Sequence, residues 1–369
     1  MTPRLIQISF LFLTTGMGFL SILFLQELWQ IEDVNLQLSF TLFFTYLIIF
    51  LLCTIGLAKI EPEKIKVNQI FGRTSSIFAV FFFFFASLVF ISQGLTTDYW
   101  ADRGSFPLSN FFLLFLLIVP FHFLISGNKT LGYLFCLIAM FSFSILQVRI
   151  NLLMLFILIL MVFNFSTKKL DFKSVFFLSF IFFITMMTIS ILRADVENEI
   201  SAIAFISKIA ASFGSEWRDG TFFHERLTVA DISFVKENFK YNFLTFIPGW
   251  SFFAPLSAQE LINAQMVSIL SEILGLRDLG VSGIRIGMIW EAYILFGYFG
   301  VVTIAIFSAI LTRISHLLIL RGELVPAAIL ISSNIYLLIG FPLFTISNFG
   351  QLIVFYLLLK LPVSMLQTK

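Results

Sequence analysis

The sequence predicts an all-α, polytopic integral membrane protein with about ten transmembrane helices and one long external loop. Of its 369 residues, 59 % are hydrophobic, 12 % are charged and 51 are Phe. A soluble fold of this length needs more polar surface to cover its core. Apolar runs of about 18 or more residues recur along the chain, long enough for a helix to cross the hydrocarbon layer. Because the runs are continuous, without in-out alternation, they favour helices over a transmembrane barrel.

The apolar windows divide the chain into three parts of one integrated membrane domain. Residues 1–192 form a seven-span N-terminal half, 193–286 form the long loop, and 287–369 form a three-span C-terminal part. The first run is interpreted as a span because it is long and lacks an Ala-x-Ala-like cleavage site. The predicted spans are 5–25, 38–58, 75–92, 108–126, 131–147, 150–166, 174–192, 287–311, 325–342 and 350–366.

The distribution of basic residues predicts the orientation. With a cytoplasmic N-terminus, 13 of the 23 Lys and Arg residues fall in inside segments, whereas the short outside segments hold only Arg103 and Arg149. This bias places both termini in the cytoplasm and the long loop outside. An even number of spans agrees with that placement.

The loop at 193–286 is far longer than a connection between two spans requires, and long loops of this kind are usually functional. Residues 195–213 and 256–275 place apolar side chains at helical spacing, and 241–256 is aromatic. These stretches predict amphipathic helices on the outer leaflet, with Trp217 and Trp250 at headgroup level.

Several chemical classes are excluded by what the chain lacks. Two Cys and three widely spaced His provide no disulfide framework and no metal site. The sequence has no Gly-rich phosphate loop, and no basic stripe interleaved with aromatic residues suggests nucleic-acid binding. We therefore expect neither a cofactor nor a nucleic-acid partner.

Arginines flank the spans at the outer face, as in QVRIN around Arg149, ILRAD around Arg193 and GIRIG around Arg285. A single arginine at a helix end can simply reach the phospholipid headgroups. Several converging on one face suit a lipid diphosphate, because guanidinium groups bind phosphate oxygens bidentately and stay charged. The predicted diphosphate ligands are Arg149 and Arg285, followed by Arg193, Arg218 and Arg277.

Two side chains are candidate bases. Glu291 lies about one turn inside an apolar helix, where a carboxylate either pairs with an arginine or takes a proton from a sugar hydroxyl. His224, in TFFHERLT, is the second candidate because an imidazole can take up a proton, although a solvated charged turn also explains the triplet. Farther along, Gly297 and Gly300 indicate close helix approach or a mobile entrance to the eighth span.

The arginine turn, the long external loop and the helix after it together resemble the Wzy-type O-antigen polymerases, which polymerise oligosaccharide repeat units. In that family the loop precedes a helix reading approximately G-E-x-Y-x-N-F-G-x-x-G. The sequence departs from this pattern at Leu295, where the family often has Asn. The matching positions are Glu291, Tyr293, Phe296, Gly297 and Gly300.

The resemblance implies a membrane-embedded C-type glycosyltransferase at the periplasmic face of the bacterial inner membrane. Undecaprenyl-diphosphate-linked oligosaccharide would be both donor and acceptor, without metal or nucleotide, and a chain-length regulator would be a partner alongside membrane lipids. Arg149 and Arg285 would hold the leaving diphosphate, and Glu291 or His224 would act as base. The residues expected to contact sugar are Trp217, Tyr241, Trp250 and Tyr293.

Three other functions compete with this interpretation. An O-antigen ligase shares the many spans, the long loop and the arginines, but transfers finished glycan to lipid A-core. A flippase or transporter for lipid-linked sugars would show internal repeats, interrupted helices and several deep charges. A non-catalytic scaffold would explain the spans but not an arginine-rich loop.

Overall fold

The described part of the chain is helical. The computed structural model describes residues 2–29, 35–57, 60, 65–67, 73–96, 109–126, 128–145, 149–165, 177, 180–181, 215–247, 257–273, 286–339 and 349–367. These residues include no β-strand. The all-α class is therefore confirmed for this part of the chain.

The long helices coincide with the predicted apolar ranges, except that the range 174–192 lies almost entirely outside the described residues. Continuous apolar sequence allows each backbone to satisfy its own hydrogen bonds, so each run folds as one helix. The helices are α1 (Pro3–Trp29), α2 (Leu36–Cys53), α3 (Arg73–Thr96), α4 (Ser109–Ser126), α5 (Lys129–Ile145), α6 (Arg149–Phe165), α13 (Met288–Leu320), α14 (Leu324–Ile339) and α16 (Gln351–Gln367).

Two of these helices, α2 and α13, are long and apolar enough to cross a membrane by length and composition. Other described apolar stretches are shorter, for example Ser76–Ser92 and Leu324–Leu338. The count of ten spans therefore stays a prediction.

Stripes of large apolar side chains point outward from the helices. On α3 the stripe comprises six residues that are 45–71 % exposed: Ile77, Phe78, Phe81, Phe84, Phe85 and Leu88. Their spacing places them on one face of the helix. A comparable stripe on α13 runs from Tyr298 to Leu320, about 33 Å at 1.5 Å per residue. That length suits a hydrocarbon layer of about 30 Å.

Two separate hydrophobic clusters hold the bundle together. The first, here called the α4–α6 core, joins α3 to α6 with α14 and α16 and includes Phe83, Leu114 and Leu158. The second, the α2–α13 core, joins α2 and α13 with part of the long loop and includes Phe50 and Trp290.

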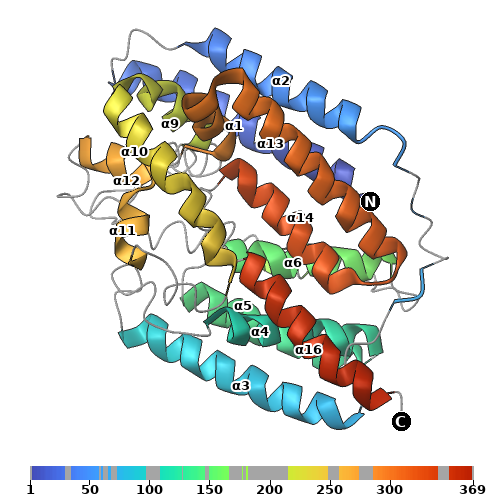
Figure 1. Cartoon of the computed structure of the whole chain (residues 1–369). Helices are drawn as coiled ribbons and strands as arrows, with labels where there is room; N and C mark the ends of the chain where they lie inside the picture. The colour runs from blue at the N-terminus through green and yellow to red at the C-terminus, as the bar shows by residue number, and fades with distance from the viewer. Residues whose placement is uncertain are drawn as a thin grey trace.

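The long loop contributes short helices gathered at one side of the molecule, where α2 and α13 begin (Figure 1). The predicted helical stretch at 256–275 is confirmed as α11 and α12, whereas 195–213 lies outside the described residues. These elements are α9 (Ser215–Phe223), η2 (His224–Arg226), α10 (Val229–Phe239), η3 (Lys240–Phe246), α11 (Ala258–Asn263) and α12 (Met266–Ile273).

Hydrogen bonds between distant segments distinguish the two ends of the bundle. At the loop end, Gln351 Nε2 at the start of α16 donates to the Thr245 carbonyl at 2.9 Å. At the opposite end, Arg313 donates to the carbonyls of Cys53 and Ile55 at 2.7 and 3.1 Å, satisfying the C-terminus of α2. Both chain termini also lie at this opposite end (Figure 1).

Candidate functional site

The candidate site is the α9–α13 junction, where the first turn of α13 meets the helix that opens the described part of the loop. Trp290 is 1 % exposed and packs against Gly220. A Cβ atom at Gly220 would overlap the Trp290 ring, so glycine is required for this close approach. The junction comprises Trp217, Gly220, Thr221, His224, Trp290 and Glu291.

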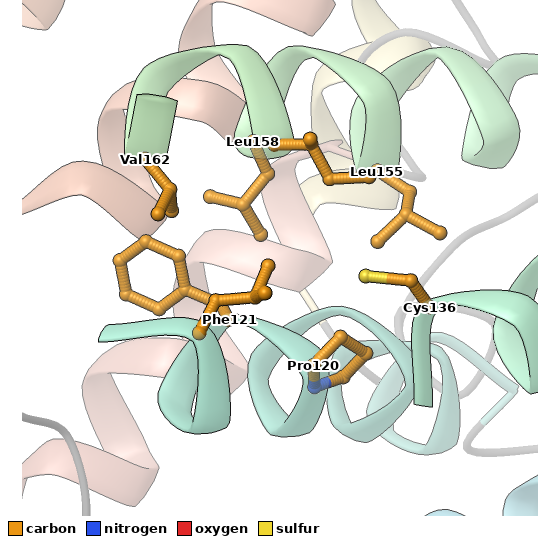
Figure 2. Close-up of a pocket in the computed structure, with 8 residues that line it drawn as sticks. Pro120, Phe121, Cys136, Leu155, Leu158 and Val162 are labelled. Atoms are coloured by element: carbon orange, nitrogen blue, oxygen red, sulfur yellow. The ribbon is translucent and has the colours of Figure 1, made fainter. Parts of the chain in front are cut away.

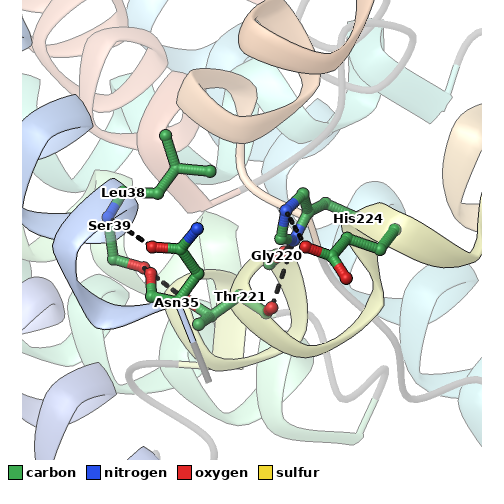
Figure 3. A network of polar contacts seen from close by, with 7 residues as sticks. Asn35, Leu38, Ser39, Gly220, Thr221 and His224 are labelled. Carbon is green, nitrogen blue, oxygen red and sulfur yellow. Dashed lines mark hydrogen bonds and ion pairs between the residues drawn. The ribbon is translucent and has the colours of Figure 1, made fainter. Parts of the chain in front are cut away.

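Helix α9 is docked from its other side by α1 and α2. The Trp217 ring lies 6.1 Å from the rings of both Phe19 and Phe43, measured between centroids. The hydroxyls of Ser39 and Thr221 are hydrogen-bonded at 2.7 Å, with both residues buried (Figure 3). A buried hydroxyl pair is costly to separate, so this bond fixes the position of α9 on α2.

His224 is held with a defined ring orientation (Figure 3). Its Nδ1 lies 3.1 Å from the carbonyl oxygens of both Gly220 and Thr221. Carbonyl oxygens only accept, so Nδ1 carries a proton and Nε2 is the nitrogen left to exchange one. Nε2 lies 3.5 Å from Oε1 of the exposed Glu225, and the His224 ring centroid is 5.0 Å from that of Trp290.

Glu291 places a carboxylate in the first turn of α13, after the N-cap residue Gly287. It is 1 % exposed, and neither carboxylate oxygen has a hydrogen-bond partner among the described residues. The helix N-terminus favours negative charge there, but buried carboxylates normally also have a direct partner. Such a partner could come from a residue outside the described ranges, as in the predicted pairing with an arginine, or from a ligand.

Only two of the five predicted diphosphate-binding arginines, Arg149 and Arg218, lie within the described residues. The Nε and Nη2 atoms of Arg218 each lie 2.6 Å from Oδ1 of Asp219, which is buried. The backbone of Arg149 begins α6. Convergence of the arginines on a diphosphate stays a prediction. The predicted ligands outside the described residues are Arg193, Arg277 and Arg285.

The predicted sugar-contacting aromatics are spread over the loop end. Trp217 is buried in the contacts with α1 and α2, whereas Tyr293 is half-buried, with its ring 5.3 Å from Tyr298. Lys240 Nζ lies 5.1 Å above the Tyr241 ring. Trp250 lies outside the described residues, and sugar contact by these side chains stays a prediction.

Several residues in or beside the junction were missed by sequence reasoning. Ser39 and Thr221 are 182 positions apart and carry no local signal for their contact. Asp219, Gly220 and Trp290 also lacked a motif. The neighbouring helix α10 does have a local signal, because Thr228 and Asp231 form the T-x-x-D pattern of a capping box.

A pocket between α4, α5 and α6 has no polar side chain suited to sugar or phosphate (Figure 2). Its lining is aliphatic and aromatic apart from the Cys136 thiol. It is therefore not the candidate site. The lining residues are Pro120, Phe121, Leu124, Cys136, Leu155, Leu158, Ile159 and Val162.

Within the described ranges, no group of three or more His, Cys, Asp or Glu side chains could hold a metal ion. No protein-family model, curated protein or solved structure matches the chain.

Proposed function

We propose that this protein polymerises lipid-diphosphate-linked oligosaccharide units at the outer face of a membrane, as a Wzy-type polymerase of the C-type glycosyltransferase class. The observation that carries the proposal is the α9–α13 junction. There, a buried carboxylate without a described partner follows Trp290, whose ring lies beside the exchangeable imidazole of His224. Two proton-accepting groups at the point where a long loop meets a span suit the activation of a sugar hydroxyl.

Membrane insertion is supported by the outward apolar stripes of α3 and α13. The proposed topology has ten spans in the bacterial inner membrane, with both termini in the cytoplasm and the loop in the periplasm. The location of both termini opposite the loop helices supports this topology (Figure 1).

In the proposed reaction, the acceptor hydroxyl attacks the anomeric carbon of the donor. The new glycosidic C–O bond forms while the bond from that carbon to the lipid diphosphate breaks, and the hydroxyl proton passes to Glu291 or His224. Undecaprenyl diphosphate leaves with the bonding electron pair. Arg149 and Arg285 would stabilise the charge that grows on it, an interaction strongest in the transition state.

A flippase for lipid-linked sugars is a second candidate, favoured by one observation. Helix α13 contains a non-helical residue, Gly297, with φ 63° and ψ −153°. Interrupted helices commonly line the substrate sites of transporters. An O-antigen ligase shares the proposed donor chemistry and differs in its acceptor.

The test uses surface polysaccharide ladders from cells whose own copy is replaced by a variant. For Glu291→Gln and Glu291→Ala we expect polymer formation to fall about 100-fold or more if Glu291 is the base. Single repeat units should still reach the surface glycolipid. Glu237→Gln, a change to an exposed carboxylate on α10, is the matched control and should leave the ladder unchanged.

Other outcomes separate the candidates. His224→Ala should lose polymer if His224 is the base, while Glu291→Gln then keeps it. Arg149→Ala and Arg285→Ala should remove long chains if both hold the diphosphate. Absence of single units at the surface would indicate a flippase or a ligase, and normal ladders in the variants of both candidate bases would contradict the polymerase mechanism.

A further inference from the structure

Helix α13 consists of two helical segments separated by Gly297. The φ of 63° and ψ of −153° at this residue belong to a region that only glycine adopts without strain. The first segment, 288–296, carries Trp290, Glu291 and Tyr293. The second, 298–320, continues to the opposite end of the bundle.

Gly300 allows the two segments to touch. A Cβ atom there would overlap the carbonyl oxygen of Ala292, eight residues earlier. In a straight helix, about 12 Å of axial rise would separate these positions. The chain therefore changes direction at Gly297, and Gly300 provides the space that this change needs. The two glycines of the G-x-x-G spacing therefore have different roles: Gly297 adopts the backbone conformation of the break, and Gly300 leaves room for the Ala292 carbonyl.

The second segment is anchored in the bundle by buried polar contacts. Asn334 of α14 donates to the Ser308 carbonyl at 2.9 Å and to the Thr312 hydroxyl at 2.8 Å. Tyr46 of α2 donates to Ser308 Oγ at 2.6 Å, and Gln7 of α1 donates to the Asn334 carbonyl at 3.1 Å. These bonds join four helices around Ser308 and resist its displacement.

The first segment belongs to the α2–α13 core and, unlike the second, also contacts the loop helices α9 and α10. Trp290 packs on Gly220 and lies beside His224. At the other end of the segment, the Phe296 ring centroid lies 6.2 Å from that of Phe239, and Lys236 Nζ is 5.5 Å from the Phe296 ring.

We propose that Gly297 and Gly300 are positioning residues that let the Glu291 segment follow the loop helices instead of the axis of the bundle. The position of Glu291 is then set by α9 and α10, while the rest of α13 stays fixed to α2 and α14. The catalytic consequence rests on the proposed function, whereas the structural consequence is independent of it.

Gly297→Ala isolates the backbone requirement, because no atom lies within 4 Å of a Cβ at Gly297 and only the dihedral angles oppose the change. Gly16→Ala in α1 is the matched control, since its Cβ also meets no atom within 4 Å and its φ is not positive. Gly300→Ala is the second test variant and acts by steric overlap.

The positions of the two segments are measured by the yield of crosslinking between two cysteine pairs, using a short thiol crosslinker in membranes. The loop pair is Phe239→Cys with Phe296→Cys, in a background without the native cysteines. The bundle pair is Arg313→Cys with the native Cys53. We expect Gly297→Ala and Gly300→Ala to lower the loop-pair yield at least fivefold and to leave the bundle pair unchanged. Gly16→Ala should change neither yield.

Two results would overturn the structural proposal. An unchanged loop-pair yield in both variants would show that the break does not position the first segment. Loss of both yields would show that the glycines hold the entire bundle instead of one segment.

The catalytic consequence is measured on purified protein in lipid nanodiscs with a synthetic lipid-diphosphate oligosaccharide, normalised to the bundle-pair yield. We expect kcat of Gly297→Ala to fall about 100-fold, with KM for the donor changed less than threefold, because a displaced base impairs chemistry more than binding. Full activity despite loss of the loop crosslink would refute positioning of Glu291 and leave the polymerase proposal intact. An inactive parent protein would instead refute the proposed function. The crosslinking yields would still test whether the break at Gly297 positions the first segment of α13.

Discussion

The two hydrophobic cores differ in what they do with buried polar groups. In the α4–α6 core, buried serines such as Ser87 and Ser142 donate to carbonyls of their own helices at 2.9 Å. One side-chain bond in this core, between the Ser76 hydroxyl and His122 Nε2 at 3.0 Å, links α3 to α4. On the α2–α13 side, hydroxyl and amide groups bond between helices, and the buried acidic side chains of the described chain, Asp219 and Glu291, lie here. Polar groups that satisfy themselves locally permit generic apolar packing, whereas bonds between helices specify one arrangement.

This contrast indicates that the two sides of the helical bundle have different roles. The α4–α6 core stabilises the bundle through apolar contact, and its pocket has no polar side chain that could bind sugar or phosphate. The α2–α13 side holds the loop, the first turn of α13 and the second segment in defined positions. Substitutions of the same chemical type should therefore be more harmful on the α2–α13 side.

The largest difference is expected between two glycines. Gly220→Ala forces a methyl group into the Trp290 ring and should destabilise the docked loop by about 1–3 kcal/mol. Gly16→Ala has open space and should be neutral or stabilising by up to about 1 kcal/mol. Denaturant unfolding in detergent, with hydrogen exchange of α9, measures both. Equal stability of the two variants would contradict the tight contact.

Two buried serines sharpen the comparison of the cores. Ser308→Ala removes the acceptor of the Tyr46 hydroxyl and should lower stability by about 1–2 kcal/mol. Ser87→Ala removes a bond to the Phe83 carbonyl of its own helix, and we expect a change within about 0.5 kcal/mol. Thermal unfolding in identical lipid gives the difference. A Ser87 variant as unstable as the Ser308 variant would remove the distinction between the cores.

The smallest effect concerns the cap of α10 in the loop. Hydrogen bonds from the hydroxyl and the amide of Thr228 lower the pKa of Asp231 below its ordinary value. The cap therefore contributes fully above the unfolded-state pKa of Asp231, and its contribution is lost as pH falls through the lowered native value. Hydrogen exchange of α10 between neutral and acid pH should show this loss.

Two substitutions test the cap directly. Asp231→Asn should remove the acid-dependent step in the exchange of α10, because the titrating group is gone. Thr228→Ala should cost about 1 kcal/mol of local stability at neutral pH. An identical acid profile in Asp231→Asn and the parent protein would assign the step to another group.

Much of the fold was predictable from the sequence because hydropathy acts locally. Runs such as 38–58 and 287–311 are apolar over enough residues to form a helix, whatever surrounds them. The α11 and α12 stretch was readable from its helical spacing. The break at Gly297 could not be predicted from the sequence, because the hydropathy is continuous across this position and gives no sign of a change in backbone direction.

The candidate site was predictable only as isolated residues. Glu291 was a candidate because a carboxylate in an apolar helix is costly unless it has a partner or a function. His224 was a weaker candidate, and its ring orientation depends on two carbonyls that one helical turn brings within 3.1 Å. The Ser39 and Thr221 contact joins distant parts of the chain, and no pattern in a single sequence reveals such a pair.

The sequence by itself determined the helical class, the approximate places of most helices and the small set of charged side chains available for chemistry. Those properties follow from composition and from the energy of apolar surface, which are additive along the chain. The tertiary structure decided that α9 docks on Trp290, that the loop helices gather where α13 begins and that α13 bends at Gly297. These features arise from close packing and buried hydrogen bonds between distant residues, whose energies depend on geometry that one-dimensional patterns do not contain.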